Sequence, residues 1–213
     1  MPTSAIKICG INTPNALDAA IRGRADHVGF NFYPPSPRFV APEVAANLGA
    51  RAEGRIGKVG VFVDADDAFL GEAVPAAGLT GIQLHGSESP ERAAQVRSRF
   101  GIPVWKVISV TRSEDVARAI AYAGAADFIL FDAKTPSGTL PGGMGLSFDW
   151  DLVSGWRGGL PWGLAGGLHP GNVAEAIRRT GAALVDTSSG VESAPGVKEE
   201  SLIAAFCMAV RAG

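Results

Sequence analysis

Short apolar runs recur along the chain and alternate with longer amphipathic segments. The runs are rich in β-branched residues and are continuous rather than alternating, as expected for parallel strands that are covered on both faces. They predict eight strands, at Ala5–Cys9, His27–Phe32, Lys58–Val63, Gly81–Leu84, Val104–Val110, Phe128–Asp132, Trp162–Ala165 and Leu184–Thr187.

Between the predicted strands, apolar residues follow helical spacing. In the first such segment Leu17, Ala20 and Ile21 share one face, and Thr13 followed by Pro14 is a helix-start signal. The same spacing predicts helices in EVAANLGARA, SPERAAQVRSRF, SEDVARAIAYAG, GNVAEAIRRTG and KEESLIAAFCMAV. Glycines that suit left-handed helix caps follow three of these segments, at Gly101, Gly124 and Gly181.

Eight strand and helix units in 213 residues give about 27 residues per unit, which is close to a compact (β/α)8 barrel. We therefore expect an α/β protein with a single TIM-barrel domain over residues 1–213. A doubly wound open sheet is the alternative, but it usually has fewer strands, and its GxGxxG fingerprint is replaced by CGINTP after the first strand. The glycine-rich stretch 137–147 is expected to be a loop of the barrel rather than a domain boundary.

Composition and charge exclude several classes of partner. The 19 basic and 21 acidic residues leave a net charge of -2 without a long run of either sign, so we expect neither nucleic acid nor a membrane surface as partner. No apolar run approaches the ~20 residues of a membrane span. The two cysteines, Cys9 and Cys207, lack the spacing of a zinc site or a disulfide framework, and free thiols favour a cytoplasmic location.

In a barrel enzyme, the chemistry lies at the carboxyl ends of the strands. Cys9 ends the first predicted strand, and its thiol is either a small core group or points toward the mouth. Asp132 follows the apolar run FILF, where an unpartnered carboxylate is costly. Facing each other across the mouth, these two groups can act as a general base and a general acid.

The last two strand ends carry turns of small residues, LAGGL and DTSSGVE. Their backbone N–H groups can approach an anion closely, and barrels often bind phosphate at this place. The simpler alternative is that the glycines only permit tight turns. Because two adjacent final units share the pattern, we predict a phosphate site at Gly166, Gly167, Ser188, Ser189 and Gly190.

Two further residues have both a functional and a structural interpretation. Arg38 offers a planar fork for a carboxylate, although an isolated loop arginine is more often a solvated charge; three nearby prolines favour a positioned group. His85 is either a ligand contact or a satisfied buried histidine. The acidic stretch 64–67 is expected to cap a helix, and we predict no metal and no nucleotide cofactor.

The strand-end motifs resemble those of the phosphoribosylanthranilate isomerase family of tryptophan biosynthesis, in family order and over almost the whole chain. The motifs are KICGIN, GFNFYPPSPRFV, VGVFVD, GIQLHG, FILFDAK with GGMGLSFDW, LAGGLHPGNV and DTSSGVES. The resemblance implies a cofactor-independent Amadori rearrangement of an aminoaldose to an aminoketose on a TIM barrel. It implies Asp132 as the general acid and Cys9 as the base. It further implies Arg38 at the anthranilate, His85 and Asp186 as substrate contacts, and the glycines and serines named above at the phosphate.

The chain departs from the family pattern at three places, one of which is the insertion-like segment TPSGTLP in the loop after the sixth predicted strand. The family commonly has GGTG where residues 142–145 read GGMG, and commonly valine where Thr187 stands. Two alternative functions stay open: an isomerase of the related histidine-pathway aminoaldose, whose enzymes use aspartate where this chain has Cys9, and a non-catalytic barrel that binds a phosphorylated ligand. We expect a small-molecule phosphorylated substrate and a monomer or homodimer.

Overall fold

The structure, a computed structural model, describes residues 4–133 and 148–213 and contains a closed barrel of eight parallel strands. The strands are β1 Ala5–Cys9, β2 His27–Asn31, β3 Gly57–Phe62, β4 Gly81–Leu84, β5 Val104–Val110, β6 Phe128–Ala133, β7 Trp162–Leu164 and β8 Leu184–Thr187. They pair in chain order, and β1 also pairs with β8, which closes the ring. The predicted TIM barrel and its eight strands are therefore confirmed, with ends shifted by no more than one residue.

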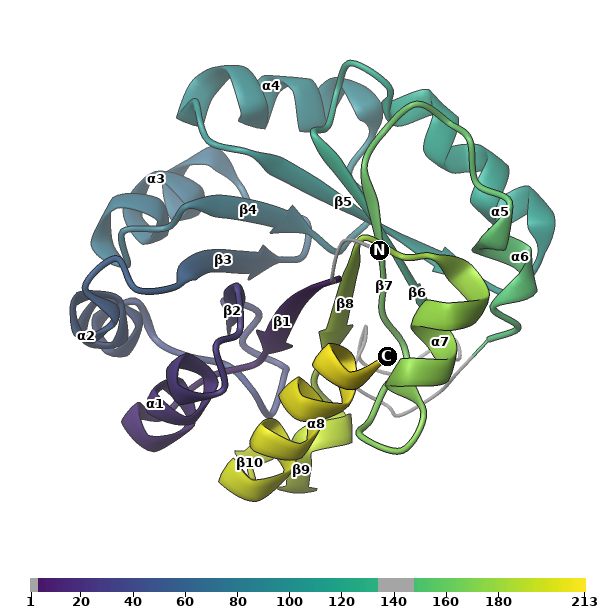
Figure 1. The fold of residues 1–213 in the computed structure, drawn as a ribbon. Coiled ribbons are helices and arrows are strands. Elements are labelled where there is room, and N and C mark those ends of the chain that lie inside the picture. The colour runs from purple at the N-terminus through teal and green to yellow at the C-terminus, as the bar shows by residue number, and fades with distance from the viewer. Residues whose placement is uncertain (1–3, 134–147) are drawn as a thin grey trace.

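Helices surround the ring of strands (Figure 1). They are α1 Pro14–Arg22, α2 Pro42–Ala52, α3 Asp67–Ala76, α4 Pro90–Phe100, α5 Ser113–Ala117, α6 Asp151–Ser154, α7 Val173–Thr180 and α8 Glu200–Ala212. The segment predicted as one helix over 113–124 is divided, because α5 is followed by the 3-10 helix η1, Arg118–Tyr122. The short helix α6 has too few residues for an apolar period and was not predicted.

Local capping explains why several helices begin and end where they do. Thr13, Asp66 and Ser89 each accept a hydrogen bond from the backbone N–H three residues ahead. Asp66 thus confirms that the acidic stretch 64–67 contributes a helix cap. Gly101 and Gly181 end α4 and α7 in the left-handed conformation, with φ of 63° and 66°.

The interior of the barrel changes from apolar to polar along the strands. Since side chains alternate between the two faces of a strand, every second residue points inward. An apolar interior cluster is formed by Val59, Trp105, Val107, Leu130, Ala165 and Leu184. Two positions after Leu130 and Leu184 come the buried polar residues Asp132 and Asp186, and β1 and β4 carry buried Lys7 and Gln83. The polar layer therefore lies toward the carboxyl ends of the strands, where a barrel carries its site.

A short segment after β8 adds an element that the sequence did not predict. The 3-10 helix η2, Ser189–Val191, leads into two antiparallel strands, β9 Glu192–Ala194 and β10 Val197–Lys198. Figure 1 shows this pair beside α8. Strands of two or three residues are too short for a recognisable hydrophobic period.

Two sequence expectations concern the chain as a whole. The predicted loop 137–147, with the departure at 142–145, lies outside the described residues. Across residues 4–133 and 148–213, no helix combines the length and the apolar character needed to cross a membrane.

Candidate active site

Cys9 ends β1 with its thiol directed into the barrel, over a glycine of the neighbouring strand. Cys9 pairs with Gly29 of β2, and a Cβ at Gly29 would lie 2.9 Å from Sγ and 3.3 Å from the Lys7 ammonium. The glycine therefore leaves the space that the sulfur and the ammonium occupy. Burial raises the pKa of the Cys9 thiol, while the cations of Lys7 and Lys198 oppose that rise.

Beneath the thiol, Lys7 and Asp186 form a buried ion pair between β1 and β8. Lys7 Nζ donates to Asp186 Oδ2 at 2.8 Å, and Lys7 has no exposed surface. Burial alone would lower the pKa of Lys7, but Asp186 and Cys9 outweigh it and raise this pKa, so the side chain stays cationic. The second oxygen of Asp186, Oδ1, is buried and accepts no hydrogen bond from any described residue. This oxygen is available to a ligand hydroxyl.

Asp132 lies at the end of β6 and is 7% exposed. Its Oδ1 accepts a hydrogen bond from the Ala133 N–H at 2.8 Å, and its Oδ2 lies 3.4 Å from His85 Nε2. Buried Gln83 places its amide 3.2 Å from His85 Nδ1, so the imidazole is held on both sides. His85 therefore belongs to the same cluster as Asp132.

A glycine that follows β7, the strand next to β6, makes room for the Asp132 carboxyl. Gly166 follows β7 with φ of +85°, and a Cβ there would lie 2.9 Å from Asp132 Oδ1 and 2.5 Å from the Ala133 nitrogen. The glycine of LAGGL thus has a steric reason besides any role toward phosphate.

We predict that Gly166→Ala lowers the free energy of unfolding by about 1–2 kcal/mol, the cost of a side chain in the left-handed region. It also lowers kcat about tenfold or more, because the added methyl displaces Asp132. Urea titration and steady-state kinetics measure the two effects. Gly155→Ala is the matched control, since Gly155 has φ of -96° and a Cβ there meets no described atom within 4 Å. Equal behaviour of the two variants would contradict the assignment.

The loops after β7 and β8, predicted to bind phosphate, pack directly on each other. Thr187 Oγ1 donates to the Leu168 carbonyl at 2.7 Å, and Gly190 lies so close to that carbonyl that no side chain would fit. Ser188 Oγ donates to the Cys9 carbonyl at 3.2 Å. The structure therefore places Ser188 beside the end of β1 and packs Gly190 against the loop after β7.

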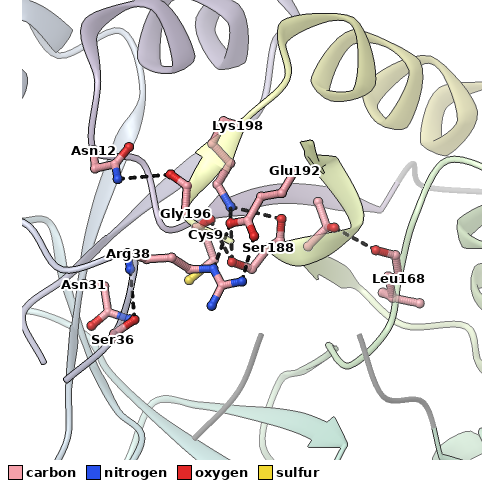
Figure 2. Close-up of polar contacts among 11 residues, drawn as sticks. Cys9, Asn12, Asn31, Ser36, Arg38, Leu168, Ser188, Glu192, Gly196 and Lys198 are labelled. Atoms are coloured by element: carbon pink, nitrogen blue, oxygen red, sulfur yellow. Dashed lines mark hydrogen bonds and ion pairs between the residues drawn. The ribbon is translucent and has the colours of Figure 1, made fainter. Parts of the chain in front are cut away.

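Arg38 is buried and belongs to an ionic cluster with two residues that the sequence analysis missed. Its Nε and Nη2 donate to the Glu192 carboxylate at 2.7 Å each, and Lys198 Nζ lies 2.7 Å from Glu192 Oε1 (Figure 2). Lys198 also donates to the Ser188 carbonyl at 2.9 Å. Glu192 is the last residue of the motif DTSSGVE, from which the sequence analysis selected only Asp186, Ser188, Ser189 and Gly190.

Several conspicuous residues lie outside this cluster. His27 packs edge-on against Trp105, and His169 accepts a local backbone hydrogen bond from Gly171. Cys207 is buried under α1, and burial raises its pKa to about 11. Lys106 forms a buried pair with Glu88 at 2.7 Å. These contacts indicate structural roles for His27, His169 and Cys207.

Taken together, the fold and the cluster define a class of (β/α)8-barrel enzyme with candidate proton-transfer groups at the mouth and candidate phosphate loops beside them. Burial raises the pKa of Asp186, and the charges of Lys7, Asp132 and His85 also act on it, which agrees with these groups lying near one another. The chain belongs to the N-(5'-phosphoribosyl)anthranilate isomerase family, whose family model matches residues 6–209.

Relatives and solved structures agree with this membership. An N-(5'-phosphoribosyl)anthranilate isomerase of Paramagnetospirillum magneticum is 53% identical over 209 residues, covering 98% of this chain and 97% of that protein. The phosphoribosyl anthranilate isomerase structure from Thermotoga maritima has a TM-score of 0.89 at 34% identity and covers 99% of this chain and 100% of that one. A further isomerase structure, in complex with reduced 1-(o-carboxyphenylamino)-1-deoxyribulose 5-phosphate, has a TM-score of 0.86 at 32% identity, covering 99% and 100%.

Proposed function

We propose that this chain converts N-(5'-phosphoribosyl)anthranilate into 1-(2-carboxyphenylamino)-1-deoxyribulose 5-phosphate, the Amadori step of tryptophan biosynthesis. The observation that carries the proposal is the placement of Cys9 and Asp132. Each points into the polar end of the barrel, and each lies against a glycine, Gly29 or Gly166, that leaves room for its reacting atoms.

Asp132 serves as the general acid. A protonated Asp132 carboxyl gives its proton to the ribose ring oxygen, the bond between that oxygen and C1 breaks, and the nitrogen lone pair forms a Schiff base. The Ala133 N–H and His85 hold the carboxyl in one orientation, so little reorganisation is needed at the moment of transfer.

Cys9 serves as the general base. Its thiolate removes the proton from C2 of the open-chain sugar, which gives an enolamine that becomes the ketone by tautomerisation. The thiolate forms in a place where burial disfavours it, and the ammonium of Lys7 is the nearest compensating charge on its own strand. No cofactor enters this sequence of proton transfers.

The remaining groups bind and orient the substrate. Gly166, Gly167, Ser188, Ser189 and Gly190 surround the phosphate, and Arg38 binds the anthranilate carboxylate. Asp186 Oδ1 accepts a hydrogen bond from a sugar hydroxyl, which satisfies the buried oxygen that the described residues leave unpaired.

Loss of phosphoribosylanthranilate fluorescence on adding purified protein tests this function. We expect turnover of this aminoaldose and much slower turnover of the histidine-pathway aminoaldose. Comparable rates on both substrates would contradict the proposal and indicate a bifunctional isomerase. No turnover of either substrate would indicate a non-catalytic barrel that binds a phosphorylated ligand.

The cell compartment and the assembly belong to the same proposal. The two free thiols favour the cytoplasm. For assembly we propose a monomer or homodimer, and sedimentation velocity at micromolar concentration distinguishes them.

A further inference from the structure

The ionic cluster of Arg38, Glu192 and Lys198 is almost completely buried, and its three charges sum to a net positive charge. The three side chains are 9%, 4% and 1% exposed, respectively. Arg38 with Glu192 alone would be a neutral, bidentate pair, which offers little net attraction to an anion. Lys198 adds a second cation, and its Nζ binds the same oxygen, Oε1, that accepts from Arg38 Nε.

The position of the cluster links it to the candidate site. Lys198 donates to the carbonyl and, at 3.2 Å, to the hydroxyl of Ser188, and Ser188 donates to the Cys9 carbonyl. Figure 2 shows Glu192 and Lys198 reaching from the β9–β10 pair toward Arg38 and Cys9. The excess positive charge therefore lies between a candidate phosphate loop and the candidate base.

Burying an excess charge is costly unless an opposite charge compensates it. Burial lowers the pKa of Lys198, whereas Glu192 and Cys9 raise it and Arg38 lowers it further. A ligand carboxylate beside Arg38 would supply the missing negative charge and would keep Lys198 protonated. The net positive charge of the cluster therefore favours an anionic group of the ligand.

We propose that Lys198 determines the preference for a substrate carboxylate, because its ammonium offsets the charge of Glu192 and gives the three side chains a net positive charge. This inference rests on the proposed function and adds a specificity-determining residue to it. Lys198 acts through Glu192 and Arg38 and takes no part in the proton transfers.

Two stable ligands test the proposal: reduced 1-(o-carboxyphenylamino)-1-deoxyribulose 5-phosphate and the same molecule without its carboxyl group. Calorimetry gives the Kd of each for wild type and Lys198→Met. We expect the variant to weaken binding of the carboxylated ligand about tenfold or more, as one lost charge near a buried anion should. Binding of the carboxyl-free ligand should change less than about threefold. An equal loss for both ligands, or no loss, overturns the proposal.

A double variant separates charge from packing. Glu192→Gln with Lys198→Met removes one charge of each sign, so the cluster again has a net charge of +1. We expect this variant to recover most of the lost affinity for the carboxylated ligand, and failure to recover contradicts a charge-based role. Lys58→Met, at a partly exposed lysine of β3, is the control that should leave both Kd values unchanged.

Wild-type protein gives a test that needs no folded variant. Raising the pH removes the proton of Lys198. The Kd of the carboxyl-free ligand divided by that of the carboxylated ligand should therefore fall toward one as the pH rises. A constant ratio contradicts the proposal. The fluorescence assay on wild type reports the proposed function separately. Turnover together with unaltered discrimination in Lys198→Met would refute this inference alone.

Discussion

Asp132→Asn is expected to lower kcat by about 10²- to 10⁴-fold, the usual range for a positioned general acid. Asparagine has the same shape and can still accept from the Ala133 N–H, so the backbone contact at 2.8 Å survives. It has no acidic proton to give to the ribose ring oxygen. The loss should therefore fall on kcat, with KM changed by less than about threefold. Steady-state kinetics with phosphoribosylanthranilate measures both parameters.

Two controls make this result specific. The urea midpoint of Asp132→Asn should stay close to that of wild type, because the carboxyl has no ion pair with Lys or Arg among the described residues. Asp18→Asn removes a partly exposed carboxylate that pairs with Arg51 on the outer helices, and it should retain wild-type kcat. Activity of Asp132→Asn within about fivefold of wild type would reject Asp132 as the acid.

The sequence predicted the barrel because parallel strands buried on both sides leave a plain signal. Each strand appears as a continuous apolar run, and the connecting helices carry caps such as Thr13 and Ser89 that the structure confirms. The same regularity located candidate site residues, since polar residues that interrupt apolar runs at strand ends have to face the mouth. Cys9 and Asp132 were found by this rule.

Glu192 and Lys198 escaped the sequence analysis for a physical reason. In the sequence they are charged residues in a short polar segment, which is typical of an exposed loop. Their burial depends on Arg38, which lies 154 residues before Glu192 and reaches it only when β1, β2 and β8 lie side by side. A contact of such long range has no local hydrophobic period, so only the closed barrel reveals it.

Inside the barrel, the two-residue alternation explains more than the sequence analysis used. Lys7 precedes Cys9 by two positions, and both therefore point inward on the same side of β1. Asp186 faces Lys7 from the paired position of β8. The strand register alone therefore brings the Lys7 cation, the Asp186 anion and the Cys9 thiol together, without a contribution from the helices.

Cys9→Ser is expected to lower kcat by about a hundredfold or more, because a hydroxyl is a far weaker acid than a thiol and supplies almost no anion at neutral pH. Steady-state kinetics tests this loss, and Cys207→Ser is the matched control, because Cys207 is a core residue of α8 that packs against Gly23 at the end of α1. Similar kcat values for the two variants would rule out Cys9 as the base.

The ionisation of Cys9 is best followed by alkylation rather than by activity. The proposed mechanism needs a deprotonated Cys9 together with a protonated Asp132, so these two requirements would oppose each other as the pH changes. Iodoacetamide reacts only with the thiolate.

Because burial raises the pKa of Cys9, the alkylation of Cys9 should be slower at neutral pH than the alkylation of glutathione. The rate should rise roughly tenfold per pH unit below that pKa. Mass spectrometry should locate the adduct on Cys9, since Cys207 is buried with a pKa of about 11. Alkylation of Cys9 faster than glutathione at pH 7 would mean that Lys7 and Lys198 outweigh burial.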